Sequence, residues 1–398
     1  MLLVKNGKIL TMAGKSLDKG YILADEGKII EITENKDKIE KRIEGKSGII
    51  VVDAEGGYVL PGFIDAHCHI GIWEDSVGFE GDDGNESTDP ITPQLRAIDG
   101  VYHADRAFTE AREGGVTTVV TGPGSANVIG GQFAALKTYG RRIEEMILKE
   151  PVAMKVAFGE NPKTVYNEKR QMPMTRMATA ALLRENLMKA KEYKEQIEKY
   201  EDNSEENEKP DYDMKLDALM RVIKKEIPLK AHAHRADDIL TAIRIAKEFD
   251  VNITIEHCTE GYLIQDILKE EGISAIVGPL LTDRSKIELK NQSIKAPGIL
   301  SKAGIKLAIM TDHPCIPVQY LGLCAAMAVK EGMDEEYALK AITINAAEIT
   351  GIADRVGSLE VGKDADMVIF SGHPFELKSR VISTIINGNV VYQKECGE

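Results

Sequence analysis

The middle of the chain alternates short apolar runs with amphipathic stretches, and this alternation constrains the fold more than any other feature of the sequence. Apolar runs of strand length occupy residues 116–122, 152–160, 228–234, 251–258, 273–279 and 305–313. Stretches with helical spacing lie between them, as in residues 235–250, where apolar side chains recur every three or four positions. Apolar strands that alternate with helices are typical of a parallel sheet covered by helices.

The closure of this sheet depends on the number of its strands. The pattern indicates about seven strands, of which the third is the least distinct and is expected within residues 127–138. Eight strands would close into a barrel, whereas an open doubly wound sheet is the competing arrangement. The segment GPGSAN at residues 122–127 lacks the third glycine of a dinucleotide-binding fingerprint, which disfavours the open sheet.

Both ends of the chain have a different pattern from the middle. Residues 1–55 and 355–398 contain alternating apolar residues broken by turn dipeptides such as Asn-Gly, which is typical of β-hairpins. Each end alone is too short to bury an apolar face, so we predict that the two pair into one small β domain. The remaining residues, 56–354, are predicted to form the barrel, with a polar and mostly helical insertion at about 161–227.

The composition excludes several classes of function. The formal net charge of −14 and the pI of about 5.2 argue against a nucleic-acid-binding protein and against docking on anionic lipid. No apolar run is long enough for a signal peptide or a membrane span. The five cysteines form no C-x-x-C pair, which argues against a disulfide framework. We expect a cytoplasmic protein that acts on a small molecule and has no nucleic-acid or membrane partner.

The histidines gather at the ends of the predicted strands. Six of the eight lie at or just after a carboxyl end, namely His67, His69, His232, His234, His257 and His313. In a barrel these ends share one face, and catalytic residues gather on that face. Histidines that converge on one point indicate a metal site.

Strand parity sorts these candidates, because side chains two residues apart point the same way. The two histidines of each His-x-His pair, at 67–69 and at 232–234, therefore share a face. The sequence does not choose between the two members of the second pair. Asp312 shares a face with Met310, so His313 points in another direction if the strand stays regular.

Imidazoles combined with a carboxylate indicate a particular metal chemistry. Neutral histidines and carboxylates suit Zn²⁺ or a similar divalent ion with one position left open for water. Such an ion lowers the pKa of its water to near 7. An aspartate beside that water can accept its proton and later deliver the proton to a leaving group. Asp312 is the candidate for this role.

Five segments carry a resemblance to a known family. They are VLPGFIDAHCHIG, HAHRADDI, TIEHC, IMTDHP and ITINAAEITGIADRVGSLEVGKDADMVIF, spread over nearly the whole chain. The set resembles the metal-dependent amidohydrolase superfamily, in particular its imidazolonepropionase- and prolidase-related branch. The resemblance implies an α/β fold with a distorted (β/α)8 TIM barrel and a small β-sandwich formed by both termini. It also implies a homo-oligomer that hydrolyses a C–N bond by metal-bound hydroxide.

The resemblance further implies the ligands of one or two metal ions. His67 and His69 match the first pair of ligands. His232 and His257 match the ligands after the fifth and sixth strands. Asp312 matches the eighth-strand aspartate, which serves as ligand and as proton shuttle.

The fourth-strand ligand is open between two residues. Two-metal members of the superfamily carry a bridging carboxylated lysine or a glutamate on this strand, and MKVAFGENP offers both Lys155 and Glu160. Strand parity points Lys155 inward. Glu160 stands at the carboxyl end, where the other ligands collect, and it resembles the glutamate of sugar deacetylases in the superfamily. We favour Glu160 and keep Lys155 as the alternative.

Two residues next to the fifth-strand ligand are predicted to bind substrate. His234 and Arg235 follow His232 directly, and the guanidinium of Arg235 suits a bidentate contact with a carboxylate. Single-metal members of the superfamily often carry a glutamate three residues after this histidine. Arg235 occupies that position here, which weakens a deaminase hypothesis.

These features together predict a metal-dependent hydrolase that cleaves an amide or cyclic amide of a small molecule. A dipeptidase and an N-acetyl-sugar deacetylase are the alternatives among enzymes. A metal-free scaffold that has kept only the fold is the alternative from another class. A binding module that uses the acidic surface is a further possibility, and it predicts that His67→Ala and Asp312→Asn leave function intact.

Overall fold

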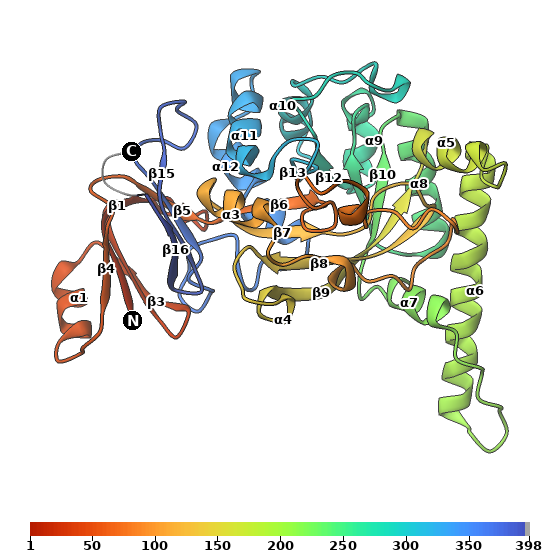
Figure 1. Ribbon diagram of the computed structural model, residues 1–398, viewed down its shortest axis with the longest axis horizontal. Helices are drawn as coiled ribbons and strands as arrows, with labels where there is room; N and C mark the ends of the chain where they lie inside the picture. The colour runs from red at the N-terminus through yellow and green to blue at the C-terminus, as the bar shows by residue number, and fades with distance from the viewer. Residues whose placement is uncertain (395–398) are drawn as a thin grey trace.

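The computed structural model describes residues 1–394, and its strands form two eight-stranded sheets (Figure 1). One sheet is rolled into a distorted barrel with helices around it, and the other joins the two ends of the chain. The predicted α/β barrel fold is confirmed, and the strands of both termini join in one sheet where a small β-sandwich domain was predicted. No helix within the described residues has the length and apolar character to cross a bilayer.

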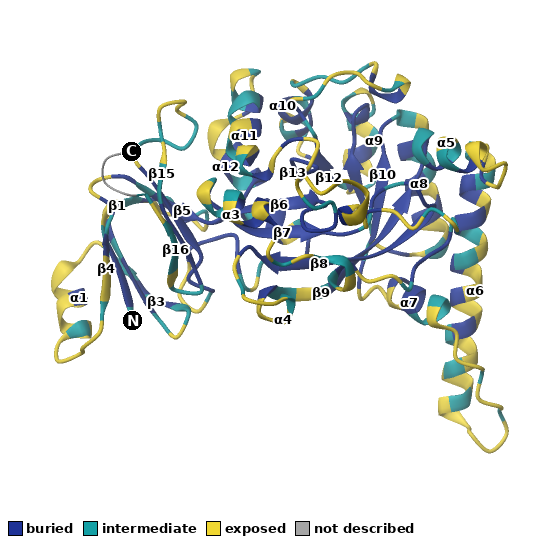
Figure 2. Cartoon of the chain, in the orientation of Figure 1, coloured by how far each residue is buried: buried dark blue, intermediate teal, exposed yellow. Residues whose placement is uncertain are grey.

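The barrel sheet runs in chain order from its first strand to its eighth. Its strands are β6 (Phe63–Cys68), β7 (Val116–Thr121), β8 (Ile129–Lys137), β9 (Ile147–Ala157), β10 (Leu229–Ala233), β11 (Ile253–His257), β12 (Ser274–Val277) and β13 (Leu307–Ile309). Beyond the last strand, the backbone N–H of His69 donates to the carbonyl of His313 at 2.9 Å, which ties the first strand to the eighth. The barrel strands are almost wholly buried (Figure 2).

The third strand departs from the expected parallel repeat. The predicted segment 127–138 does contain a strand, β8, but β8 runs antiparallel to both β7 and β9. No helix separates β7 from β8 along the chain, and only a crossover connection can return a strand to the parallel direction. The other neighbouring strands of the barrel pair in parallel.

The second sheet draws its strands from both termini. They are β1 (Leu2–Ile9), β2 (Leu17–Asp25), β3 (Lys28–Thr33), β4 (Ile50–Asp53), β5 (Tyr58–Pro61), β14 (Met367–Phe370), β15 (Val381–Ile386) and β16 (Asn389–Gln393). The C-terminal strand β14 pairs with β5, so the two chain ends share one hydrogen-bonded sheet. This sheet buries an apolar cluster of its own, in which Val4, Ile22 and Met367 take part.

Helices cover the barrel and extend beyond it. They are α1 (Lys36–Ile43), α2 (Ala97–Gly100), α3 (Arg106–Glu113), α4 (Ile143–Met146), α5 (Glu160–Glu168), α6 (Arg176–Asp202), α7 (Met214–Ile223), α8 (Ala236–Phe249), α9 (Gln265–Glu270), α10 (Ala296–Lys302), α11 (Leu321–Lys330), α12 (Glu335–Ala341) and α13 (Ile344–Ile349), with 3₁₀ turns η1 (Gly78–Gly81), η2 (Gly261–Leu263), η3 (Ile287–Leu289) and η4 (Val318–Tyr320). Helices α5 to α7 fill the connection from β9 to β10, and the far end of α6 projects away from the barrel with an exposed surface (Figures 1 and 2).

Helix α8 illustrates how the sequence determines these elements. Its apolar residues recur at helical spacing, and Ile239, Ile243 and Ala246 are buried. Acidic residues in its first turn and a lysine in its last turn complement the helix dipole. The helix ends at Asp250, whose φ of 52° places it in the left-handed region that terminates helices. The helix begins two residues after His234, so the segment that carries His232 and His234 leads directly into it.

Candidate active site

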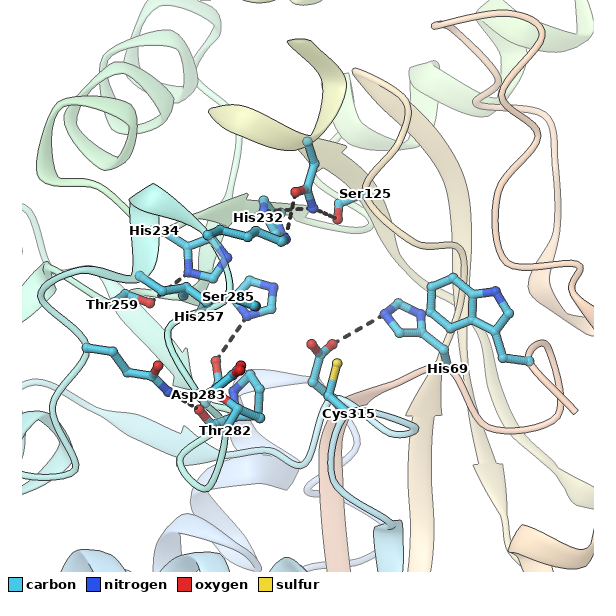
Figure 3. A pocket seen from close by; sticks show the side chains of 18 residues that line it. His69, Ser125, His232, His234, His257, Thr259, Thr282, Asp283, Ser285 and Cys315 are labelled. Atoms are coloured by element: carbon cyan, nitrogen blue, oxygen red, sulfur yellow. Dashed lines mark hydrogen bonds and ion pairs between the residues drawn. The ribbon is translucent and has the colours of Figure 1, made fainter. Parts of the chain in front are cut away.

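A cavity of about 340 Å³ opens at the carboxyl ends of the barrel strands (Figure 3). Five of the predicted site residues line it, namely His69, His232, His234, His257 and Asp312. They come from β10 and β11 and from the segments that follow β6, β10 and β13. Residues separated by more than two hundred positions along the chain thus meet at one end of the barrel.

One group of possible metal ligands is centred on Asp312. Ligand atoms of His67, His257 and Asp312 lie within 4.8 Å of one another. The Oδ1 atom of Asp312 lies 3.3 Å from Nε2 of His69 and 3.7 Å from Nε2 of His67. Burial opposes the ionisation of Asp312, but His69, Lys155 and His232 together outweigh burial and lower the pKa of this carboxyl below its ordinary value.

Hydrogen bonds behind the histidines fix which nitrogen of each ring faces the cavity. Nδ1 of His69 lies 2.7 Å from the carbonyl oxygen of Gly122, and Nδ1 of His257 lies 3.0 Å from that of Gly278. A carbonyl oxygen only accepts, so Nδ1 carries the proton in both rings and Nε2 keeps its lone pair. Burial lowers the pKa of His257 well below its ordinary value. The ring is therefore neutral at pH 7 and able to bind a metal.

The ring of His67 is held by a buried ion pair that the sequence analysis missed. Nδ1 of His67 lies 2.7 Å from Oε2 of Glu256, so Nδ1 donates and Nε2 is left to face Lys155 and Asp312. Lys230 neutralises Glu256 at 2.8 Å and also donates to the carbonyl of Ala66 at 2.9 Å. A carboxylate that orients a ligating histidine is typical of metal sites. The sequence signal was a charged residue in the middle of each of two apolar strands, β10 and β11.

A second group of possible ligands contains three histidines. Ligand atoms of His232, His234 and His257 lie within 4.8 Å of one another. Nδ1 of His234 lies 2.7 Å from the hydroxyl of Thr259. Among residues 1–394, Nε2 of His234 and Nδ1 of His232 have no hydrogen-bond partner. The sequence left open which member of the 232–234 pair binds metal, and the structure brings both into one group.

The two candidates for the fourth-strand ligand occupy different positions. Lys155 is buried in β9, and its Nζ lies 3.2 Å from Nε2 of His67. Burial lowers the pKa of Lys155 to about 8. Glu160 begins α5, and its backbone N–H donates to Glu288 at 3.0 Å. The structure brings Lys155, and not Glu160, together with the histidines, because the chain turns into α5 at Gly159 and carries Glu160 away from them.

Three residues of the site adopt left-handed backbone conformations that are uncommon for side chains with a Cβ atom. They are His257, Cys258 and Asp312, with φ angles of 66°, 51° and 54°. Such conformations are concentrated at functional sites, where the surrounding structure maintains them. These conformations also interrupt the alternation of side-chain directions along β11 and along the segment after β13. Strand parity therefore predicts the direction of a side chain only up to these positions.

The predicted substrate-binding residues separate in the structure. His234 lines the cavity, but Arg235 does not, because its guanidinium turns outward and donates to Asp237 at 2.9 Å. The loop after β12 brings another cation to the cavity. Lys286 lines it, and its Nζ donates to Oδ1 of Asn161 at 2.7 Å. The sequence analysis missed Lys286, because the loop has no periodicity that would relate it to the strands.

Comparisons with known proteins agree with this architecture. The family model of the amidohydrolase family matches residues 58–391. The crystal structure of an amidohydrolase from Thermotoga maritima MSB8 aligns over 99% of this chain and 100% of that chain, with 44% identity and a TM-score of 0.93. An imidazolonepropionase from Symbiobacterium thermophilum is 24% identical over 404 residues, which cover 93% of this chain and 91% of that protein.

A third relative is longer than this chain. The amidohydrolase tasK from Hapsidospora irregularis is 27% identical over 395 residues, or 94% of this chain, but the match spans only 40% of that protein. The match to the family model covers most of the present chain, including all eight barrel strands. The chain therefore belongs to the amidohydrolase family.

Proposed function

We propose that this protein is a metal-dependent hydrolase that cleaves the C–N bond of an amide or cyclic amide in a small molecule. The observation that carries the proposal is the convergence of His67, His257 and Asp312, whose ligand atoms lie within 4.8 Å of one another at the end of the barrel. The amidohydrolase family is typically metal-dependent, and membership of it supports the same chemistry. The relatives named imidazolonepropionase support a cyclic amide as one substrate class.

The residues present fit a divalent metal. Nδ1 of His232 and Nε2 of His234 are buried and have no hydrogen-bond partner in residues 1–394. They lie in one group with His257, whose Nδ1 donates to the carbonyl of Gly278 and whose Nε2 therefore keeps its lone pair. A buried polar atom without a partner is costly, and a divalent cation between these nitrogens would satisfy them. A set of histidines and carboxylates suits Zn²⁺ among the common divalent ions.

The first ion is assigned to His67, His69 and Asp312, with Lys155 as the fourth-strand residue. The contact of 3.2 Å between Nζ of Lys155 and Nε2 of His67 supports Lys155 over Glu160 for this position. When bound, a divalent ion lowers the pKa of a water molecule and polarises the carbonyl group of the substrate. Glu256 keeps the Nε2 lone pair of His67 directed at Lys155 and Asp312.

The proton transfer is assigned to Asp312. Its carboxylate lines the cavity, and its Oδ1 lies 3.3 Å from Nε2 of His69. The carboxylate accepts the proton of the attacking water, and it returns that proton to the nitrogen when the C–N bond breaks. The reaction thus consumes one water and yields a carboxylic acid and an amine, which stay in one molecule when the substrate is a cyclic amide.

Lys286 and Asn161 are assigned to substrate binding. Lys286 replaces Arg235 as the candidate for a substrate carboxylate, because its Nζ faces the cavity whereas Arg235 is paired outside it. An ammonium group binds a carboxylate as a point charge. A cavity of about 340 Å³ suits a compact molecule. The substrate class is therefore an amide or lactam that carries an anionic group.

The test combines metal content with a substrate screen. Protein purified without added metal is analysed for bound metal, stripped with a chelator, and reconstituted with zinc or manganese. Each form is assayed on N-acyl amino acids, dipeptides, lactams and N-acetyl sugars. We expect turnover of an amide or lactam that metal restores and that Asp312→Asn lowers by about 100-fold or more. Absence of bound metal and of activation on reconstitution would favour the metal-free scaffold instead.

A further inference from the structure

The cavity at the end of the barrel contains the only tryptophan of the chain, and the proposed reaction does not use it. Trp73 lies in the loop after β6, lines the cavity and is only partly buried. Its ring packs edge-on against His69, with 4.5 Å between the ring centroids and 74° between the planes. His69 and His234 lie on opposite sides of the cavity, so the indole lies on the side away from His234 (Figure 3).

Several contacts hold the indole in place. Its Nε1 donates a hydrogen bond to the carboxylate of Asp82, and the backbone N–H of Trp73 donates to the carbonyl of His69 at 3.1 Å. Two glycines leave the space that the ring fills, because a Cβ atom would lie 2.2 Å from the ring at Gly84 and 2.8 Å from it at Gly124. The ring is therefore preorganised, and a ligand that contacts it loses little free energy in ordering the side chain.

The rest of the cavity offers few apolar surfaces. Among the described residues that line it, Trp73 is the only phenylalanine, tyrosine or tryptophan. Pro279 and Leu289 add two smaller apolar side chains, and most of the other lining residues carry imidazole, hydroxyl, amide or charged groups. The indole is therefore the main surface on which an apolar part of a ligand can be bound.

A cation lies close to this aromatic surface. Gly124 packs against the indole, and its neighbour Ser125 accepts a hydrogen bond from Nδ2 of Asn161 at 2.6 Å. Oδ1 of the same amide accepts a hydrogen bond from Nζ of Lys286 at 2.7 Å. One amide side chain and one step of backbone thus link the cation to the aromatic ring. A ligand that reaches both needs an anionic group a few bonds away from a planar apolar group.

We propose that Trp73 determines specificity by binding an aromatic group next to the scissile carbonyl of the substrate. The inference rests on the proposed function and narrows its substrate class to an aromatic amide that carries a carboxylate, such as an N-aroyl amino acid. Trp73 contacts His69, which is assigned to the first ion, so the group bonded to the scissile carbonyl is the part of the substrate nearest the indole. Lys286 then binds the carboxylate on the other side of the amide.

The test measures equilibrium binding of two carboxylates that cannot be hydrolysed. γ-Phenylbutyrate has the spacing of N-benzoylglycine, with methylene groups in place of the amide. γ-Cyclohexylbutyrate replaces the aromatic ring by a saturated ring of similar size. Isothermal titration calorimetry on full-length protein incubated with zinc gives the ratio of the two dissociation constants, in which the contribution of the carboxylate cancels.

Three variants are compared with wild type. Trp73→Leu removes the aromatic surface, Trp73→Phe keeps an aromatic ring, and Phe79→Leu is the matched control. Phe79 lies in the same loop, is 95% exposed and does not line the cavity. We expect wild type and Phe79→Leu to bind γ-phenylbutyrate at least about threefold more tightly than γ-cyclohexylbutyrate. This preference should disappear in Trp73→Leu and persist in Trp73→Phe.

Equal binding of the two carboxylates by wild type, or an unchanged preference in Trp73→Leu, would overturn the inference. Loss of the preference in Phe79→Leu or in Trp73→Phe would also overturn it, since the effect would then belong to the loop or to the size of the side chain. These outcomes concern only the ring that the cavity prefers. They leave standing the proposed function, which metal content and turnover test separately.

The fluorescence of Trp73 gives a test that needs no variant. Because the chain has one tryptophan, its emission reports on this position alone. Saturation with γ-phenylbutyrate is expected to change the intensity or the wavelength of the emission, with the dissociation constant that calorimetry gives. An unchanged emission at saturation would overturn the inference, even if Trp73→Leu does not fold.

Discussion

Replacement of Asp364 by asparagine tests how the two sheets are held together. Asp364 is buried, and its carboxylate pairs with Lys137 at the end of β8 at 3.0 Å, with Arg355 at 2.8 Å and with Lys28 at 2.5 Å. Burial alone would raise the pKa of this carboxyl, but the hydrogen bond from Arg355 and the charge of Lys137 outweigh it and lower the pKa to about 2. Asp364 thus joins the barrel to the terminal sheet.

The size of the effect follows from that pKa. The carboxyl has an ordinary pKa of 3.8 and a pKa of about 2 in the folded chain, and this difference corresponds to about 2 kcal/mol of stability at pH 7. The folded pKa is the lower one, so the contribution is complete well above pH 4 and is lost as the pH falls through about 2. About half of it remains at pH 3. Asparagine cannot ionise, so Asp364→Asn is expected to lose the whole contribution at pH 7.

Urea denaturation followed by far-ultraviolet circular dichroism measures this loss. Wild type, Asp364→Asn and the control Asp354→Asn, at an exposed position of the same segment, are compared at pH 7, 5 and 3. The expected deficit of Asp364→Asn is about 2 kcal/mol at pH 7 and about 1 kcal/mol at pH 3, with little change in the control. A deficit below about 0.5 kcal/mol at pH 7, or one that does not shrink at pH 3, would refute the reasoning.

Four further variants test the site. Glu256→Gln removes the charge that orients His67 and neutralises Lys230, so the affinity of the first metal site should fall about 10- to 100-fold in a chelator competition; unchanged affinity would remove this role. Lys286→Met should lower kcat/KM about 10- to 100-fold for substrates with a free carboxylate and leave uncharged ones unaffected, and an equal effect on both classes would contradict the assignment. Lys155→Met should reduce bound metal while Glu160→Gln does not, and the reverse result would restore Glu160 as the fourth-strand ligand.

Much of the fold followed from local patterns. Alternation of apolar strands with helices predicts the parallel barrel because each parallel pair needs a crossover helix. The direction of β8 could not be inferred, because the glycines at 130 and 131 obscure the strand pattern and the lack of a helix before it leaves no local signal. The pairing of β5 with β14 was foreseen only in outline, since register depends on contacts between distant segments.

Part of the candidate site could likewise be predicted from the sequence, and part could not. Histidines on strands were identifiable because a strand end fixes both the position and the direction of a side chain, as for His67 and His257. Lys286 was missed because it lies in an irregular loop whose path only the packed structure determines. Arg235 was misleading for the opposite reason. Its position beside the histidines was correct, but the first turn of α8 supplies Asp237, which holds the guanidinium outside the cavity.

The central claim is that side chains from separate barrel strands hold a metal ion in one cavity. The most direct test is an anomalous difference map at the zinc absorption edge from crystals of zinc-loaded protein. We predict a peak about 2.0 to 2.2 Å from Nε2 of His67 and of His69, next to the carboxylate of Asp312. A map with full zinc loading in solution but no peak in this cavity, or with peaks only at surface carboxylates, would contradict the account.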